Sequence, residues 1–215
     1  MPALPEPPPA PAMTAGVILA AGASRRLGRP KQLLPYGGGV LLDAVLATAR
    51  ECGFDQTVVA LGGSAAEVQR TVDTAGAEVV LNPDFGAGCS SSIAAAMAGL
   101  HPETDAVVLL LGDQPGVRAA TVRAVLAALG GQPAETPRRA GIAVCHYDDG
   151  IGHPLAFARR FFPELSALHG DKAVWKLLEQ RADDVVEVAM PGAVPLDVDT
   201  EEDYRRILAE LEGPR

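Results

Sequence analysis

The chain has 215 residues, which is enough for one ordinary domain with a sizeable core but too few for two full domains. Hydrophobic residues make up 48% and charged residues 21%, values that are typical of globular proteins and that exclude global disorder. The 27 acidic residues outnumber the 18 Lys and Arg residues, and the resulting net charge of −9 argues against a protein that binds duplex nucleic acid.

Neither a leader peptide nor a membrane span is predicted. The N-terminus lacks a charged region followed by an apolar one, and no apolar run approaches the roughly 20 residues that a bilayer-spanning helix needs. The three cysteines, Cys52, Cys89 and Cys145, are odd in number and widely spaced, so we expect buried thiols rather than disulfides or a zinc site. These features predict a cytoplasmic protein with no membrane partner.

Residues 1–13 contain six prolines, which lack the backbone N–H that helices and central strands need. We predict an extended, disordered tail here, with a proline motif for a binding partner as the alternative. The remaining residues, 14–212, are predicted to form a single domain.

From residue 15 onward, short apolar runs rich in β-branched residues and leucine alternate with amphipathic helical patterns. Strands are predicted at 15–20, 57–61, 78–81, 106–111 and 142–145. Helices are predicted around 41–49, around 122–129 and from Thr200 onward, where Asp203 forms a weak variant of the capping box. This alternation predicts a three-layer, Rossmann-like α/β fold with a mostly parallel sheet. Ligands of such sheets bind beyond the carboxyl ends of the strands.

The loop after the first predicted strand is strongly cationic. It contains Arg25, Arg26, Arg29 and Lys31, and its Gly22 and Gly28 let the backbone approach a ligand closely. Backbone N–H groups and basic side chains together suit a polyanion such as a triphosphate, whereas a solvated basic loop is the plainer alternative. The sequences G-x-x-x-x-G-K-[ST] and G-x-G-x-x-G are absent, which excludes a Walker loop and a standard dinucleotide fingerprint.

Two acidic segments complete the candidate site. Asp113 lies in a Gly-Asp-Gln-Pro turn after the most apolar strand, where a carboxylate is well placed to bind Mg²⁺. Asp197 and Asp199 alternate along an extended segment, so both carboxylates lie on one side of it. An ordinary turn and capping of the last helix are the respective alternatives.

The stretch LAAGASRRLGRPKQLLP resembles the signature L-A-[AG]-G-x-S-x-R-[ML]-G-x-x-K-x-L-L-P of the MobA-like nucleotidyltransferase family. The GDQP turn resembles the family's G-D-[QMT]-P motif, and the sequence DVDT at 197–200 resembles D-[IV]-D-T. The resemblance covers nearly all of the chain after the tail. It implies a Rossmann-like nucleotidyltransferase that moves a nucleoside monophosphate from an NTP to a phosphate-bearing small-molecule acceptor and releases pyrophosphate.

The resemblance also implies roles for individual residues. Lys31, Arg25 and Asp113 are expected to be catalytic, with Mg²⁺ bound by Asp113 and, as a second ligand, by Asp199; Asp197 remains an alternative for the second position. The expected binding residues are Leu19, Ala20, Ala21, Gly22, Ser24, Arg26, Gly28, Asn82 and His153. Asn82 is expected to hydrogen-bond the base or ribose and His153 to help bind the acceptor phosphate, whereas a turn residue before proline is the plainer interpretation of His153.

Guanylyl-transferring members resemble L-A-G-G where this chain has Ala21, and the Gly152-His153-Pro154 stretch resembles the cytidylyl-transferring branch. CTP is therefore the favoured nucleotide. For that branch the acceptor is the molybdenum-bound pterin cofactor, and a transient contact with a molybdoenzyme is implied.

Three other functions remain open. One is an NAD(P)H-dependent oxidoreductase of the nicotine-blue type, which the missing dinucleotide fingerprint disfavours. The second is a sugar-phosphate nucleotidyltransferase, which shares the general fold. The third is a non-catalytic factor that hands a nucleotide-bearing cofactor to an apo-enzyme, which the intact Lys31 and Asp113 disfavour.

Overall fold

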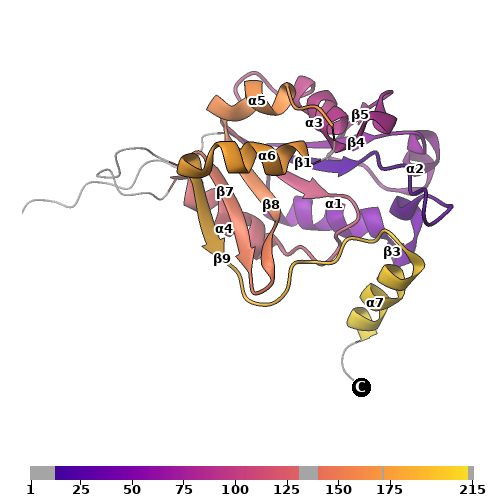
Figure 1. Cartoon of the computed structure of the whole chain (residues 1–215). Coiled ribbons are helices and arrows are strands. Elements are labelled where there is room, and N and C mark those ends of the chain that lie inside the picture. Colours follow the sequence, from indigo (N-terminus) through magenta and orange to yellow (C-terminus); the bar gives the residue numbers. More distant parts are fainter. Residues whose placement is uncertain (1–12, 131–139, 171, 213–215) are drawn as a thin grey trace, which may run out of the picture.

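A computed structural model describes residues 13–130, 140–170 and 172–212 (Figure 1). The predicted tail at 1–13 therefore lies, except for Met13, outside the described residues. The main sheet contains the strands β1 (Thr14–Ala20), β4 (Gln56–Leu61), β5 (Glu78–Leu81), β6 (Ala106–Leu111), β7 (Ile142–Tyr147), β8 (Gly150–Ala158) and β9 (Val185–Ala189). Their order is β5-β4-β1-β6-β8-β7-β9, and only β8 runs against its neighbours. A short hairpin pairs β2 (Pro35–Tyr36) with β3 (Gly39–Val40).

The five predicted strands are confirmed, and so is the mostly parallel sheet. Strands β8 and β9 escaped prediction because Gly, His and Pro occupy much of the first half of β8 and Glu187 interrupts β9. In β8, the register against β7 jumps from Leu155, opposite Val144, to Gly152, opposite Cys145, so His153 and Pro154 fall in an irregularity. Proline is tolerated there because no ladder hydrogen bond needs its missing N–H. The plainer interpretation of His153, a turn residue before proline, is therefore wrong, because the residue lies within a strand.

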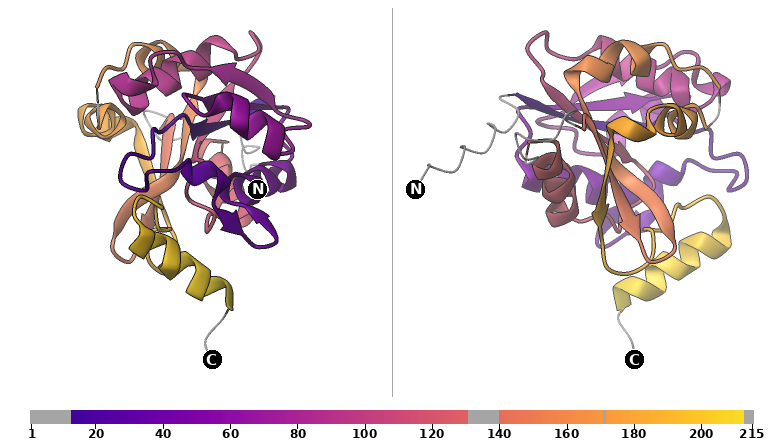
Figure 2. Two further views of the ribbon diagram at one scale, coloured as in Figure 1. Left: turned by 90° about the vertical axis from the view of Figure 1, so that its right-hand side faces the viewer. Right: turned by 60° about the vertical axis from the view of Figure 1, so that its left-hand side comes forward.

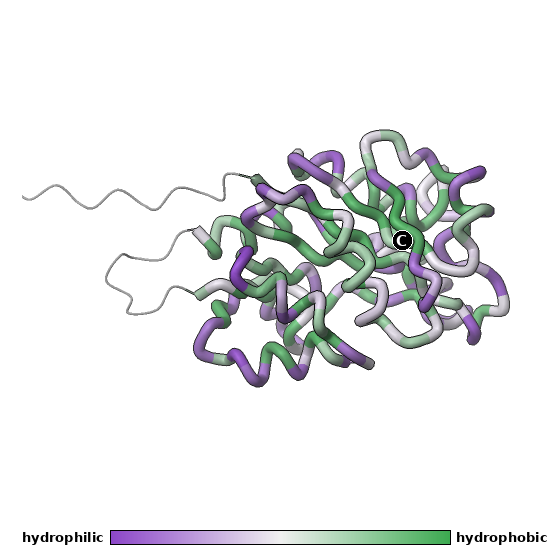
Figure 3. Tube along the Cα trace, turned by 90° about the horizontal axis from the view of Figure 1, so that it is seen from above, coloured by the Kyte–Doolittle hydropathy of each residue, from purple (hydrophilic) through white to green (hydrophobic). Residues whose placement is uncertain are grey.

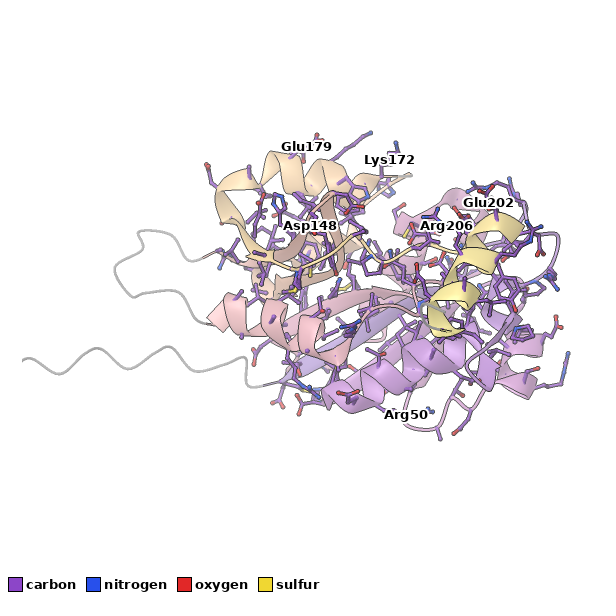
Figure 4. The ribbon with its side chains drawn as sticks, turned by 90° about the horizontal axis from the view of Figure 1, so that it is seen from below. Arg50, Asp148, Lys172, Glu179, Glu202 and Arg206 are labelled. Atoms are coloured by element: carbon purple, nitrogen blue, oxygen red, sulfur yellow. The ribbon has the colours of Figure 1, made fainter. Side chains whose placement is uncertain are left out.

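Helices cover both faces of the sheet. They are α1 (Leu41–Cys52), α2 (Ala65–Thr71), α3 (Cys89–Ala98), α4 (Ala119–Gly130), α5 (Phe162–Ser166), α6 (Ala173–Gln180) and α7 (Glu201–Glu212). Short 3-10 helices occupy Lys31–Leu33, Phe85–Ala87, Arg159–Phe161 and Ala182–Asp184. Helices α1, α2 and α4 pack on one face and α3, α5 and α6 on the other, so Arg50 of α1 and Glu179 of α6 lie on opposite sides of the molecule (Figure 4). Within the described residues, no helix is long and apolar enough to cross a membrane.

The alternation of side chains along β1 explains the layers. Val17 and Leu19 point into the cluster with α3, α5 and α6, whereas Ile18 and Ala20 point into the cluster with α1, α2 and α4. Hydropathy follows this plan, because the central strands are the most hydrophobic part of the trace (Figure 3). A strand with two buried faces reads as a continuous apolar run, which is why β1 was recognisable.

Helix α7 lies apart from both helix layers, at the edge of the molecule (Figure 2). Its Ile207 packs on a small cluster that includes Leu27 and Leu34 of the loop after β1. The capping box predicted at its start is confirmed: the Thr200 hydroxyl accepts a bond from the Asp203 N–H (3.2 Å), and the Asp203 carboxylate accepts one from the Thr200 N–H (2.9 Å). Helix α7 thus packs directly on the cationic loop.

Candidate active site

The site forms where β1 and β6 end side by side. The two strands pair in parallel up to Leu19 opposite Leu111, so the loops that follow begin next to each other. The Gly112 N–H donates to the Leu19 carbonyl (2.9 Å), and a Cβ at position 112 would lie 2.7 Å from the Cβ of Ala20. Only glycine allows this approach, and the approach brings Asp113 against the cationic loop.

Lys31 is the centre of the site. Its ammonium contacts the Asp113 carboxylate and lies 2.9 Å from Oδ1 of Asp199. The side chains of Lys31 and Asp113 are each only 13% exposed. Burial disfavours the charge on Lys31, but the two carboxylates outweigh burial and raise its pKa, so Lys31 is an ammonium ion at neutral pH. The three residues singled out in three distant segments are thus in direct contact.

The remaining cations of the loop are divided between solvent and the start of α7. Arg26 donates to Asp199 (2.6 Å), and Arg29 donates to Glu201 (2.6 Å) while lying over the ring of Tyr204. These pairs are exposed, and each is worth little stability in water. Burial opposes ionisation of Asp199, but its bonds to Lys31 and Arg26 outweigh burial and lower its pKa. Arg25 is exposed.

Two adjoining cavities open at this edge of the sheet. The inner cavity, of about 230 Å³, is lined by the predicted residues Leu19–Gly22 together with Phe85 and Asp113. The outer cavity, of about 490 Å³, is lined by Ser24, Arg25 and Arg26 and is referred to below as the basic hollow. Lys31 lines both. The inner cavity can hold a base and sugar, and the basic hollow can hold a polyanion beside them.

Ser24 and Gly28 determine the fold of the cationic loop. The Ser24 hydroxyl accepts a hydrogen bond from the Lys31 N–H (3.0 Å), and the Ser24 carbonyl accepts one from the Gly28 N–H (3.0 Å). Gly28 has a φ of 66°, which an L side chain rarely adopts. These bonds fold the loop back on itself, so that Lys31 returns to the strand end from which the loop began.

Asn82 has a different position from the one expected. It is 4% exposed, its amide donates to the hydroxyls of Ser91 (2.9 Å) and Ser92 (3.0 Å), and its Oδ1 accepts from the Asp84 N–H (2.9 Å). Both N–H donors of Asn82 are thus already used, so donation to a base or ribose would require breaking a bond to Ser91 or Ser92. Asn82 therefore holds its loop closed, and Phe85 of the same loop is the residue that lines the inner cavity.

His153 is brought beside the site rather than into it. Its ring meets Trp175 edge to face, with 5.7 Å between centroids, and it lines a small pocket of about 60 Å³ together with Leu19 and Cys89, which also line the inner cavity. Burial lowers the pKa of His153 to about 4. At neutral pH its imidazole is uncharged, so it can offer an acceptor phosphate a hydrogen bond but no positive charge.

Acid is expected to destabilise the protein through His153. Its pKa of about 4 in the folded state lies below the ordinary value of 6.5, so the unfolded chain binds more protons between these pH values. The free energy of unfolding should fall as the pH drops from 6.5 towards 4, by at most about 3 kcal/mol from this group. Urea unfolding of wild type and H153Q at pH 7 and pH 4.5 measures the difference. An identical pH dependence in both proteins would contradict the expectation.

Two glutamines of the site were missed at the level of sequence. Gln32 and Gln114 are each 2% exposed and directly follow Lys31 and Asp113. Gln32 donates to the Ala20 carbonyl (2.6 Å), and Gln114 donates to the Pro195 carbonyl (2.9 Å), which fastens the segment leading to Asp197 and Asp199. Their positions next to the two key residues were the available signal.

Asp197 also lines the inner cavity. Partial burial, and then the nearby charge of Asp113, raises the pKa of Asp197 to about 6, although the residue keeps an exposed surface. Asp113 and Asp199 contact one ammonium, so their oxygens converge on a small volume. Within the described residues, no group of three or more His, Cys, Asp or Glu side chains forms a complete metal site. Two carboxylates fit a divalent ion whose remaining ligands are substrate phosphates and water, as is usual for Mg²⁺.

Known proteins resemble the chain over most of its length. The sequence profile of a family described as MobA-like NTP transferase domain matches residues 16–185. The structure of Rv0371c from Mycobacterium tuberculosis is 47% identical, with a TM-score of 0.84 over 92% of this chain and 97% of that chain. A second structure of Rv0371c, in complex with manganese, is 44% identical, with a TM-score of 0.80 over 92% of this chain and 99% of that one.

The matches to two curated relatives differ in how much of each chain they cover. Nicotine blue oxidoreductase from Paenarthrobacter nicotinovorans is 32% identical over 202 residues, which are 90% of this chain and 95% of that protein. The bifunctional protein GlmU from Cellvibrio japonicus is 34% identical over 113 residues, or 52% of this chain. The match spans only 24% of the length of GlmU.

Proposed function

Because the chain belongs to the MobA-like NTP transferase domain family and is by family and fold a nucleotidyltransferase, we propose that it transfers CMP from CTP to a phosphorylated small molecule and releases pyrophosphate. The proposed acceptor is the molybdenum-bound pterin cofactor, the acceptor of the cytidylyl branch that the sequence resembles. A cytoplasmic location and a transient contact with the molybdoenzyme that receives the product belong to the same proposal.

The observation that carries the proposal is the convergence of Lys31, Asp113 and Asp199 where the inner cavity meets the basic hollow. A CTP whose base and sugar occupy the inner cavity has its phosphates beside Lys31 and Arg25. An acceptor phosphate is already ionised at neutral pH, so it can attack the α-phosphorus without a covalent protein nucleophile. The chain's task is then to hold both substrates in line and to stabilise the negative charge on the departing pyrophosphate with Lys31, Arg25 and Arg26.

We propose Asp113 and Asp199 as the residues that hold Mg²⁺. The manganese complex of Rv0371c supports a divalent ion in proteins of this kind. When bound, the ion neutralises charge on the nucleotide phosphates. Lys31 is held by the same two carboxylates, so it is positioned next to any metal ion that they bind and to phosphate groups bound to that ion.

The preference for CTP rests on Ala21. This residue is 4% exposed and lines the inner cavity, where guanylyl-transferring relatives have glycine. We propose that its methyl group narrows the cavity enough to disfavour the larger purine base. Ala21→Gly should therefore weaken discrimination between CTP and GTP while leaving the phosphate contacts unchanged.

A nucleotide panel tests the proposed function. The wild type and A21G are mixed with Mg²⁺ and with CTP, UTP, GTP or NADH, and thermal unfolding and pyrophosphate release on adding candidate acceptors, a sugar phosphate among them, are measured. A bound nucleotide stabilises the folded state, by about 2.7 kcal/mol at a concentration 100 times its Kd. We expect CTP to give the largest shift in wild type and GTP to gain in A21G. A shift with NADH alone would overturn the proposal.

The oxidoreductase is the second candidate, because nicotine blue oxidoreductase matches 90% of this chain at 32% identity. It requires that NADH or NADPH bind at the same strand ends. Loss of NADH absorbance with an oxidised dye, without pyrophosphate release from any NTP, would favour it over nucleotidyl transfer.

A further inference from the structure

Gln32 is a buried side chain in the wall of the nucleotide cavity that the proposed chemistry does not use. It follows Lys31 in a short 3-10 helix and is 2% exposed. Its amide nitrogen lies 2.6 Å from the Ala20 carbonyl and 3.3 Å from the Gly22 carbonyl. Within the described residues, its side-chain oxygen is buried and has no hydrogen-bond partner.

This arrangement does not maximise the stability of the folded protein. A buried amide oxygen without a partner costs free energy, because it has lost its bonds to water. A methionine of similar shape would fill the same space without that cost. What methionine lacks is the N–H pair that binds two carbonyl oxygens, so the two bonds to Ala20 and Gly22 are the feature that requires glutamine.

Those two bonds orient the peptide groups of the turn after β1. A trans peptide is planar, and its C=O and N–H point in opposite directions. When the carbonyls of Ala20 and Gly22 point at Gln32, the N–H groups of Ala21 and Ala23 point away from it. Ala21 lines the inner cavity and Ala23 lines the basic hollow. The bonds to Gln32 therefore fix the direction of two backbone N–H groups, and both belong to residues that line the cavities in which a nucleotide is expected to lie.

The neighbouring contacts leave the turn little other support. The Leu19 carbonyl is held by the Gly112 N–H, but beyond Ala20 the chain leaves the sheet. Gly62 approaches the Ala21 carbonyl so closely that a Cβ there would lie 2.5 Å from its oxygen. One side of the turn is thus packed against Gly62 at the end of β4. On the other side, Gln32 of the cationic loop binds the turn.

We propose that Gln32 is a positioning residue for nucleotide binding: it holds the Ala20–Gly22 turn in the shape in which the backbone N–H groups of Ala21 and Ala23 can bind the nucleotide. The inference rests on the proposed function, because it assumes that an NTP occupies this site. The donors act on the ground state and the transition state alike, so their loss raises KM for the nucleotide more than it lowers kcat.

Two variants separate positioning from packing. Gln32→Met keeps the size of the side chain and removes the donor, whereas Gln32→Glu places an anionic acceptor against two carbonyl oxygens. The control is Gln56→Met. Gln56 is also buried, at 9% exposed, and its amide binds the Gly99 carbonyl (3.0 Å) and the His101 N–H (2.9 Å), but it lies at the start of β4, at the opposite end of the sheet.

Binding of CTP with Mg²⁺ is measured by calorimetry, KM and kcat by pyrophosphate release, and Tm by thermal unfolding without nucleotide. We expect Q32M to weaken CTP binding by about 10- to 100-fold with kcat within a few-fold of wild type, the scale of losing one or two hydrogen bonds to a charged ligand. Q32E should bind CTP more weakly than Q32M does. Q56M should lose at least as much Tm as Q32M and keep wild-type affinity.

The outcomes are distinguishable. CTP affinity in Q32M equal to wild type overturns the inference, as does a loss of affinity in Q56M as large as that in Q32M for the same loss of Tm. If wild type itself binds no NTP while its Tm is normal, the proposed function fails, and the role of Gln32 in nucleotide binding fails with it.

Discussion

Replacing Lys31 with methionine is expected to lower pyrophosphate release from CTP by about 10²-fold or more, the scale of losing one preorganised group that stabilises charge in the transition state. Among the described residues, Lys31 is the one cation that contacts both carboxylates and lines both cavities, and its side chain is only 13% exposed. A buried charge interacts with other charges more strongly than an exposed one, because the dielectric constant around it is lower. Replacing the exposed Arg25 or Arg26 singly should therefore lower the rate of pyrophosphate release by a smaller factor.

The matched control is Lys176→Met, which changes an exposed lysine on α6. Initial rates at saturating CTP and Mg²⁺ measure the effect, with thermal unfolding to show that K31M remains folded. Turnover of K31M within a few-fold of the K176M rate would refute the role of Lys31.

Asp113→Asn should have an effect of similar or larger size, a loss of about 10²- to 10³-fold in turnover, because the amide keeps the shape of the side chain and removes its negative charge. The expected signature is a raised Mg²⁺ requirement rather than a change in CTP specificity. Asp73→Asn, at a side chain that is 77% exposed, is the control.

Titration of the rate with Mg²⁺ and with Mn²⁺ measures the metal requirement of D113N. The same titration on D197N and D199N identifies the second ligand. If D113N showed the wild-type metal dependence and turnover, Asp113 would not be a metal ligand.

The sequence was most informative where strands are buried on both faces. The runs that became β1, β4 and β6 are nearly all apolar, because neighbours cover both sides. Strand β8 has Gly, His and Pro in its first half, and only its pairing with β6 and β7 makes it a strand. Tertiary pairing of this kind leaves no local pattern to recognise.

The candidate site was predictable to the extent that strand ends determine it. Parallel pairing of β1 and β6 places Asp113 beside the cationic loop, as the rule for ligands of parallel sheets implies. The contact between Lys31 and Asp199 joins positions 168 residues apart and depends on how the chain returns after β9. The burial of Gln32 and the internal bonds of Asn82 depend on the packing of their loops, to which residue type gives no guide.

The docking of α7 affects the order in which the protein matures. Leu27 and Leu34 precede six of the seven strands of the main sheet in the chain, whereas Ile207, on which they pack, follows all seven. The same is true of Glu201 and Tyr204, which hold Arg29 and the Pro35 carbonyl. On the ribosome, where folding begins before translation is complete, the sheet can therefore form before α7 packs on the cationic loop. In a nascent chain, the contacts of α7 with the cationic loop can therefore form only after α7 has emerged.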